Sequence, residues 1–238
     1  MLKDVAADGQ PGPAGPCAEI HYDRGPEYGP EAVGGTVDPG GDRYLEIWNL
    51  VFDQYLRGEG QGKDFPLLGD LDQTAIDTGA GLERIAFLLQ DKANMYETDQ
   101  VFPVIAAAQE ISGKRYGANL DDDVRMRVVA DHVRSSLMLI ADGVTPGNEG
   151  RGYVLRRLLR RAIYHGRLMG IRGAFLTTYS HEVARILGDV YPELVEQQPL
   201  IDGIISAEEE RFGATLDAGE ASLSAELGRL REGEVLSG

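Results

Sequence analysis

Asp77 and Arg84 flank a glycine-containing turn within residues 76–89 (IDTGAGLERIAFLL). The small residues 78–81 would let the backbone approach a ligand closely. A carboxylate is suited to bind an amino group, and an arginine fork is suited to a phosphate or a carboxylate. The stretch therefore indicates a site for a ligand that carries both kinds of group. The alternative is an ordinary strand–turn–helix with a solvated Glu–Arg pair.

The apolar residues after the turn predict the helix that carries Arg84. Leu82, Ile85, Ala86 and Leu89 recur at helical spacing, so one face of this helix is expected to be buried. A buried face would anchor the acid and the arginine near one another.

Residues 44–56 (YLEIWNLVFDQYL) predict a buried strand, because aromatic and branched residues dominate them. Alternation along a strand places Glu46 and Trp48 on one face and Asn49 on the other. A buried acid or asparagine is costly without a partner, so a ligand, a metal or another side chain should meet it. Trp48 fits either a ligand pocket or an ordinary core.

A helix predicted for residues 153–169 carries a stripe of arginines. Between residues 151 and 172 there are seven arginines and His165, and no acid. In a chain of net charge −16, this local positive stripe favours binding to a nucleic-acid backbone. The alternative is that the arginines pair with acids elsewhere in the chain. The residues that lie one turn apart and share a face are Arg156, Arg157, Arg160 and Arg161.

Composition sets limits on the whole chain. A net charge of −16 over 238 residues argues against a uniformly basic nucleic-acid binder. Cys17 is the only cysteine, so no internal disulfide or cysteine-rich zinc site is expected, and a reducing cytoplasm is the natural location. We expect no metal site formed by the protein alone. No apolar run approaches the roughly 20 residues of a membrane span, so no membrane contact is expected.

A change in composition near residue 113 predicts two domains, residues 1–112 and 113–238. The first is expected to contain loops (1–16, 24–42 and 57–74) and strands, and the second almost only helices, which makes an α+β fold. The acidic run after residue 202 predicts a long solvated helix without chemistry.

Six stretches together resemble alanyl-tRNA synthetase, a class II aminoacyl-tRNA synthetase. They are GPAGPCAEIHYDRG (12–25), RYLEIWNLVF (43–52), IDTGAGLERIAFLLQ (76–90), MYETDQVFPVI (95–105), RVVADHVRSSLMLIADGVTPGNEGRGYVLRRLLRRA (127–162) and EEERF (208–212). The resemblance implies part of a class II antiparallel sheet followed by an all-helical tRNA-recognition domain. It also implies ATP-dependent activation of alanine, with Mg²⁺, and transfer to tRNA(Ala).

The resemblance assigns roles to matching residues and no catalytic side chain. For ATP it implies Arg84, Gly79, Gly81 and Glu46, the last also as a magnesium contact. For alanine it implies Asp77, Trp48 and Asn49, although Trp48 and Asn49 face opposite sides of a regular strand. For the tRNA acceptor stem it implies Asn148 at a base edge and Arg151, Arg156, Arg157, Arg160 and Arg161 at the backbone. Asn148 could instead cap a helix in the GNEG turn.

The sequence also departs from the family pattern. Nothing in it matches the first two class II motifs, Ala14 stands where cysteine is usual, and Asp53 stands where methionine is expected. We therefore expect weak or no alanine activation by this chain alone, and a second chain could supply the missing motifs. The alternatives are a non-catalytic RNA-binding module derived from the family, or a truncated product that folds poorly.

Overall fold

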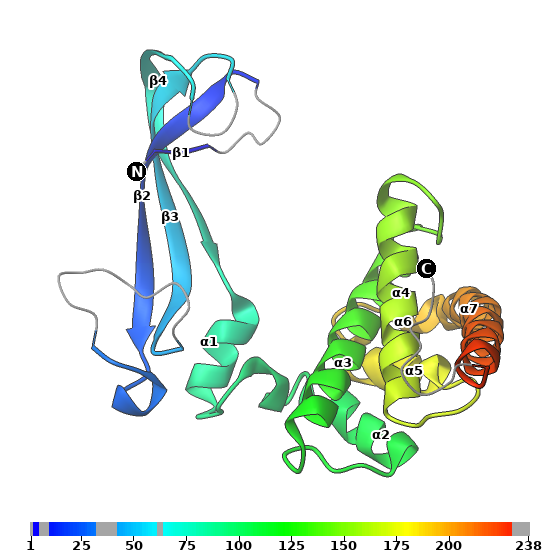
Figure 1. Ribbon diagram of the computed structural model, residues 1–238. Coiled ribbons are helices and arrows are strands. Elements are labelled where there is room, and N and C mark those ends of the chain that lie inside the picture. Colours follow the sequence, from blue (N-terminus) through cyan, green and yellow to red (C-terminus); the bar gives the residue numbers. More distant parts are fainter. Residues whose placement is uncertain (1, 5–9, 32–41, 61–63, 230–238) are drawn as a thin grey trace. The chain divides into compact units, whose positions relative to one another are not determined.

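The computed structural model describes residues 2–4, 10–31, 42–60 and 64–229, which form two compact units, Met1–Met95 and Tyr96–Gly238 (Figure 1). The division lies before residue 113, where the composition changes. Residues 96–112 belong to the second unit because their helix, α2 (Phe102–Ser112), contributes Val104, Ile105 and Ala108 to the helical core.

The first unit is built on a four-stranded antiparallel sheet in the order β1-β2-β3-β4. The strands are β1 (Leu2–Asp4), β2 (Gly12–Asp23), β3 (Tyr44–Arg57) and β4 (Leu67–Ala80). A 3₁₀ turn, Pro26–Tyr28, follows β2, and helix α1 (Leu82–Leu89) follows β4. The strand predicted for residues 44–56 and the α+β fold are confirmed.

Two stretches predicted as loops are partly strand. Residues 12–16 lie in β2 and residues 67–74 lie in β4. Both are rich in glycine or polar residues, and pairing on the two sides of β3 overrides their weak strand propensity. A β-carbon at Gly15 would sit 1.6 Å from the carbonyl oxygen of Phe52, so only glycine permits this pairing. Of the other predicted loop segments, residues 32–41 lie outside the described residues.

The burial predicted for α1 is wrong. Leu82 is 77% exposed and Leu89 is 82% exposed, while Ile85 and Ala86 are half-buried. Among the described residues the helix is held instead by Phe87, which is 5% exposed. Its N-terminus is tied to the sheet by a hydrogen bond from the Gly81 amide to the Ile47 carbonyl at 3.3 Å. The helix is therefore positioned by its first turn and one aromatic side chain.

The second unit is helical, as predicted. Besides α2 it contains α3 (Leu120–Ala141), α4 (Gly150–Leu168), α5 (Leu176–Leu187), α6 (Glu193–Glu196) and α7 (Gln198–Leu227). Asn119 caps α3 by accepting hydrogen bonds from the amides of Asp121 and Asp122. Gly113 ends α2 in a left-handed conformation with φ 68°.

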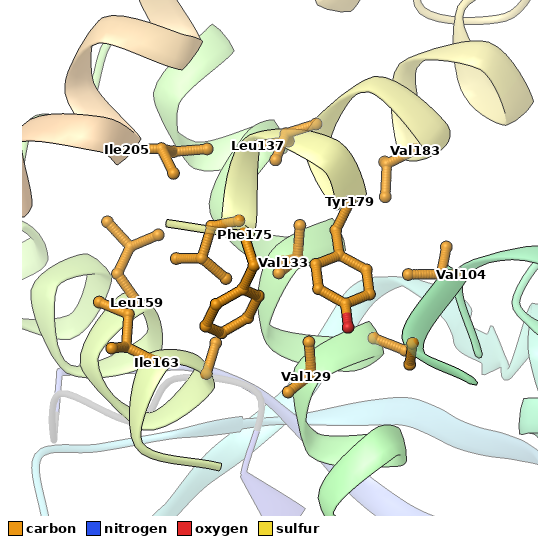
Figure 2. Packing of buried hydrophobic residues seen from close by; sticks show 14 of the residues in the cluster. Val104, Val129, Val133, Leu137, Leu159, Ile163, Phe175, Tyr179, Val183 and Ile205 are labelled. Carbon is orange, nitrogen blue, oxygen red and sulfur yellow. The ribbon is translucent and has the colours of Figure 1, made fainter. Parts of the chain in front are cut away.

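The core of this unit is formed by buried apolar residues of six helices, α2 to α7. Figure 2 shows Val129 and Val133 of α3 and Leu159 of α4 packed around the rings of Phe175 and Tyr179. The two rings meet edge to face with centroids 5.6 Å apart. Val104 of α2 and Ile205 of α7 close the cluster, so the core fixes how α4 and α7 lie against one another.

The long helix expected after residue 202 is confirmed as α7, but two acids of that run are buried rather than solvated. Glu208 is 2% exposed and Glu209 is 4% exposed. Glu209 accepts hydrogen bonds from the amides of Phe175 and Leu176 at the start of α5, and Glu208 faces α4. In the described part of the chain, no helix has both the length and the apolar character needed to cross a membrane.

Candidate functional site

The sheet of the first unit places Asn49 and Asp77 on the same face. Asn49 pairs with Gly79, and its second neighbour Val51 pairs with Asp77. Directly opposite residues of an antiparallel pair point to the same side, and so do residues two apart on one strand. Glu19 of β2 pairs with Asn49 and joins this face. A carboxylate, an amide and a second carboxylate therefore share one surface.

Asn49 is oriented by a side chain of the sheet. Its Nδ2 donates to Glu19 Oε1 at 3.2 Å, and His21 Nε2 lies 3.2 Å from the other oxygen of that carboxylate. This supplies the partner that the sequence required for a polar residue in a half-buried strand. Asp77, by contrast, is exposed and can meet a ligand.

Trp48 lies on the opposite face of the sheet from Asp77. Its indole N–H donates to the hydroxyl of Thr78, which in turn donates to the Asn49 carbonyl at 3.0 Å. The side chain is 41% exposed, so it is not a core tryptophan among the described residues. Of the two pocket candidates that alternate along β3, Asn49 is the one beside Asp77.

Arg84 is exposed and anchored at one nitrogen. Its Nη1 donates to the Glu46 carbonyl at 2.7 Å and lies 4.0 Å from the Glu46 carboxylate. The remaining nitrogens of the guanidinium are available to an anion such as a phosphate. Glu46 offers a single carboxylate, which fits Mg²⁺ as one ligand among waters and phosphate oxygens rather than as a protein cage. No cluster of three or more metal-binding side chains occurs in the described residues.

Gly79 and Gly81 leave the surface around the turn open. A β-carbon at Gly79 would have nothing within 4 Å, so packing does not require glycine there. A β-carbon at Gly81 would come within 3.1 Å of the Arg84 side chain. The small residues thus leave room for a ligand above β4 and for the arginine beside it.

Sequence reasoning missed the role of Asp53 at this face. Asp53 is 7% exposed, and its Oδ1 has no hydrogen-bond partner among the described residues. Burial raises the pKa of this carboxyl, and the negative charge of Asp77 raises it further. The only signal in the sequence was an acid where methionine was expected. Asp53 therefore places a second, buried carboxyl group next to Asp77.

The second unit divides the arginines of α4 into two groups. Glu208 of α7 lies 2.7 Å from Arg160 Nε and 3.4 Å from Arg156 Nε, so these two hold the helices together. Near the end of the stripe two more arginines pair with acids of α7, Arg167 with Asp217 and Arg172 with Glu220. Within the described ranges, the arginines of this stripe (151–172) that form no ion pair are Arg151, Arg157 and Arg161, all exposed.

Asn148 precedes α4 and does not cap it. The helix begins at Gly150, and the side chain of the N-cap residue, Glu149, makes no capping hydrogen bond. Asn148 Oδ1 instead accepts a hydrogen bond from Arg156, whose other terminal nitrogen donates to the Pro146 carbonyl at 3.2 Å. The exposed amide nitrogen of Asn148 therefore points its donors away from this contact, where a base edge could accept them.

Comparison with known proteins agrees with these features. The family described as "tRNA synthetases class II (A)" matches residues 3–238. An alanine–tRNA ligase of Clavibacter michiganensis subsp. michiganensis is 54% identical over 97% of this chain and 26% of its own length. One of Kocuria rhizophila is 58% identical over 90% of this chain and 24% of its own. The chain spans about a quarter of the length of these curated relatives. It belongs to the class II (A) tRNA synthetase family, and its sequence resembles a segment of the alanine–tRNA ligases.

Proposed function

We propose that the chain is a segment of an alanine–tRNA ligase that contributes to binding alanine, ATP and the acceptor stem of tRNA(Ala). The observation that carries the proposal is the shared face of Asn49 and Asp77 beside the open glycine turn and Arg84. The relatives named alanine–tRNA ligase, similar over nearly the entire chain, support it.

In this proposal the sheet positions the reacting groups. Asp77 binds the ammonium of alanine, Asn49 orients it, and Arg84 holds phosphate oxygens of ATP. The carboxylate of alanine attacks the α-phosphorus and pyrophosphate leaves, while cationic groups neutralise the developing charge. When bound, Mg²⁺ would add positive charge there, with Glu46 as one ligand. The alanyl group then passes to the terminal ribose of the tRNA.

The helical unit would bind the tRNA. Asn148 supplies hydrogen-bond donors for a base edge, and the three arginines without ion pairs supply contacts to phosphates. Arg156 and Arg160 would instead fix α4 against α7, because both pair with Glu208. A cytoplasmic location goes with this proposal.

The test is ATP–pyrophosphate exchange in the presence of alanine. Since the chain spans about a quarter of its relatives' length, we expect little exchange by the purified chain and restoration by a second chain that carries the first two class II motifs. Asp77→Asn should abolish the restored exchange, and the exposed Asp72→Asn on the same strand should not. Robust exchange without the second chain would contradict the expected dependence, and exchange insensitive to Asp77→Asn would contradict the site.

The second candidate is a non-catalytic RNA-binding module, favoured by the exposed arginines of α4. Titration with tRNA(Ala) at several salt concentrations separates the two. Steeply salt-dependent binding without adenylate formation, even with the second chain present, would support the module.

A further inference from the structure

A groove lies on the solvent side of α4 where it meets α7. Its volume is about 350 Å³, and its lining combines aromatic rings with guanidinium groups. The lining residues are Tyr153, Arg156, Arg157, Arg160, Arg161 and Tyr164 of α4 and Phe212 of α7.

The spacing along α4 places these side chains in one stripe. Tyr153, Arg157, Arg161 and Tyr164 follow one another at intervals of four, four and three residues, so they are neighbours on the helix surface. Tyr153 is 50% exposed and Tyr164 is 47% exposed. Both rings therefore present apolar surface to solvent at the two ends of a cationic segment.

The floor of the groove is rigid. Arg160 is bound to the buried Glu208 at 2.7 Å, and its guanidinium lies 5.0 Å from the centroid of the Phe212 ring. Arg156 is held by the same carboxylate. The carboxylate of Glu208 offsets one positive charge of this pair and holds both arginines in place.

The rim of the groove carries two further exposed cations, of which Arg161 also lowers the pKa of Asp131 on α3. Arg157 and Arg161 are exposed and form no ion pair with any described residue. They lie one helical turn apart, about 6 Å, which is close to the separation of neighbouring phosphates along a nucleic-acid strand. The groove thus joins an apolar, aromatic interior to a pair of exposed cations.

We propose that this groove binds an unpaired nucleotide of an RNA, with its base stacked on Tyr153 or Tyr164 and the adjoining phosphates on Arg157 and Arg161. The inference rests on the proposed RNA binding and names which part of the RNA meets α4. In a duplex the base faces are covered by their neighbours, and only unstacked bases can lie against aromatic side chains. Stacking combined with a basic track is how single strands are held without reading sequence.

The experiment measures binding of the full 238-residue chain to two labelled probes by fluorescence anisotropy. One probe is a short single-stranded oligoribonucleotide, and the other is a blunt RNA duplex of equal length. We expect at least one of Tyr153→Ala and Tyr164→Ala to weaken single-strand binding about fivefold or more, the lower end for loss of one stacked base. Tyr164→Phe should keep the affinity, because the ring remains.

Matched controls separate the groove from the rest of the surface. Tyr191→Ala removes a tyrosine that is 39% exposed and lies outside the groove, and it should leave both affinities unchanged. Replacing Arg157 and Arg161 together by alanine should weaken binding to both probes. Replacing a groove tyrosine by alanine should weaken binding to the single-stranded probe only.

Two outcomes would overturn the inference, and they differ. Equal single-strand affinity of Tyr153→Ala, Tyr164→Ala and the unaltered chain, with loss only in the arginine variant, would show phosphate contact without stacking and leave the proposed tRNA binding standing. Absence of binding to either probe and to tRNA(Ala) at low salt would remove both proposals. Thermal unfolding of each variant verifies that it is folded.

Discussion

Glu208 shows how a single carboxylate can organise a cationic surface. It is 2% exposed and lies within 3.4 Å of side-chain nitrogens of Arg156, Arg160 and Arg211. Removing one partner of a buried charge cluster leaves the others uncompensated, which costs more than the cluster itself stabilises. The contribution of Glu208 to stability should therefore be measurable when its side chain is removed.

We predict that Glu208→Ala lowers the free energy of unfolding by about 2 kcal/mol. This is less than the roughly 3–5 kcal/mol for a fully buried pair, because Arg160 and Arg211 reach solvent. Urea unfolding followed by circular dichroism measures the change. The neighbouring exposed Glu210→Ala should shift the unfolding free energy by less than about 0.5 kcal/mol, and equal losses would contradict the role of Glu208.

Glu209 predicts a dependence of stability on pH. Burial raises the pKa of its carboxyl, and the amides of Phe175 and Leu176 offset only part of this rise. The folded state therefore binds the proton more tightly than the unfolded state, so the stabilising contribution is present below the ordinary value of 4.5 and is lost as pH rises through the higher folded value.

Glu209→Gln should remove this dependence. The amide oxygen of glutamine still accepts from the two backbone N–H groups and carries no charge. We expect the variant to match the unaltered chain near the ordinary carboxyl pKa and to equal or exceed its stability at neutral pH. Urea unfolding of both proteins at a series of pH values tests this, and a variant less stable than the unaltered chain at neutral pH would contradict it.

At the residue scale the sequence predicted exposed groups better than buried ones. Asp77 and Arg84 stand out in the sequence because glycines and a family pattern surround them, and the structure leaves both exposed. Glu208 and Asp53 do not stand out, because a charged residue is normally solvated and its burial depends on which helix or strand it meets. The choice between Trp48 and Asn49 also needed the register of β3 on β4.

At the scale of elements, the start of α3 depends on one side chain. Asn119 accepts hydrogen bonds from the amides of Asp121 and Asp122, two donors that otherwise lack helical partners. We predict that Asn119→Ala lowers the unfolding free energy by about 1 kcal/mol, and that Asn119→Asp retains it. Urea unfolding of the three proteins measures both, and equal stability of the alanine variant would contradict the cap.

Gly166 and Gly219 offer a matched pair of helical glycines. A β-carbon at Gly166 of α4 would meet the Phe175 ring at 2.1 Å, whereas one at Gly219 of α7 would have nothing within 4 Å. Gly166→Ala should therefore destabilise by about 1–3 kcal/mol through overpacking, and Gly219→Ala should stabilise by about 0.5–1 kcal/mol. Thermal unfolding distinguishes them, and shifts of the same sign would contradict the packing between α4 and α5.

The helices were predictable because their apolar periodicity is local. The span expected at 153–169 matches α4 (Gly150–Leu168) to within a few residues. The start of β4 was not predictable, because residues 67–74 are largely polar and exposed and become a strand only by pairing with β3. Likewise the buried face expected for α1 depended on a cover that the described residues do not supply.

At the scale of the whole molecule, the net charge of −16 should repel RNA while α4 attracts it. Only ion release at local contacts sets the salt dependence. Each phosphate contact contributes roughly 0.7–0.9 to the slope of log affinity against log salt. Replacing Arg157 and Arg161 by alanine removes two contacts and should reduce the slope for tRNA by about 1.5. Arg185→Ala, an exposed arginine paired with Glu182 on α5, should leave the slope unchanged. An unchanged slope in the double variant would contradict the contacts.

The family was visible in the sequence, whereas the division of the chain was less so. Motif stretches along the chain carried the resemblance, and the match over residues 3–238 confirms it. The composition change was placed near residue 113, although β4 ends at Ala80 and α2 already begins at Phe102. The compact units divide between Met95 and Tyr96, because α2 is apolar and packs into the helical core.

The position of Glu208 has a consequence for how this surface can change over time. Its carboxylate belongs to α7, yet it fixes two arginines of α4 beneath the groove. Under the proposed RNA binding, substitutions on α7 can therefore change the affinity while the arginines and tyrosines of α4 stay the same. In related proteins, the residue at position 208 of α7 could therefore differ while the groove residues of α4 are unchanged.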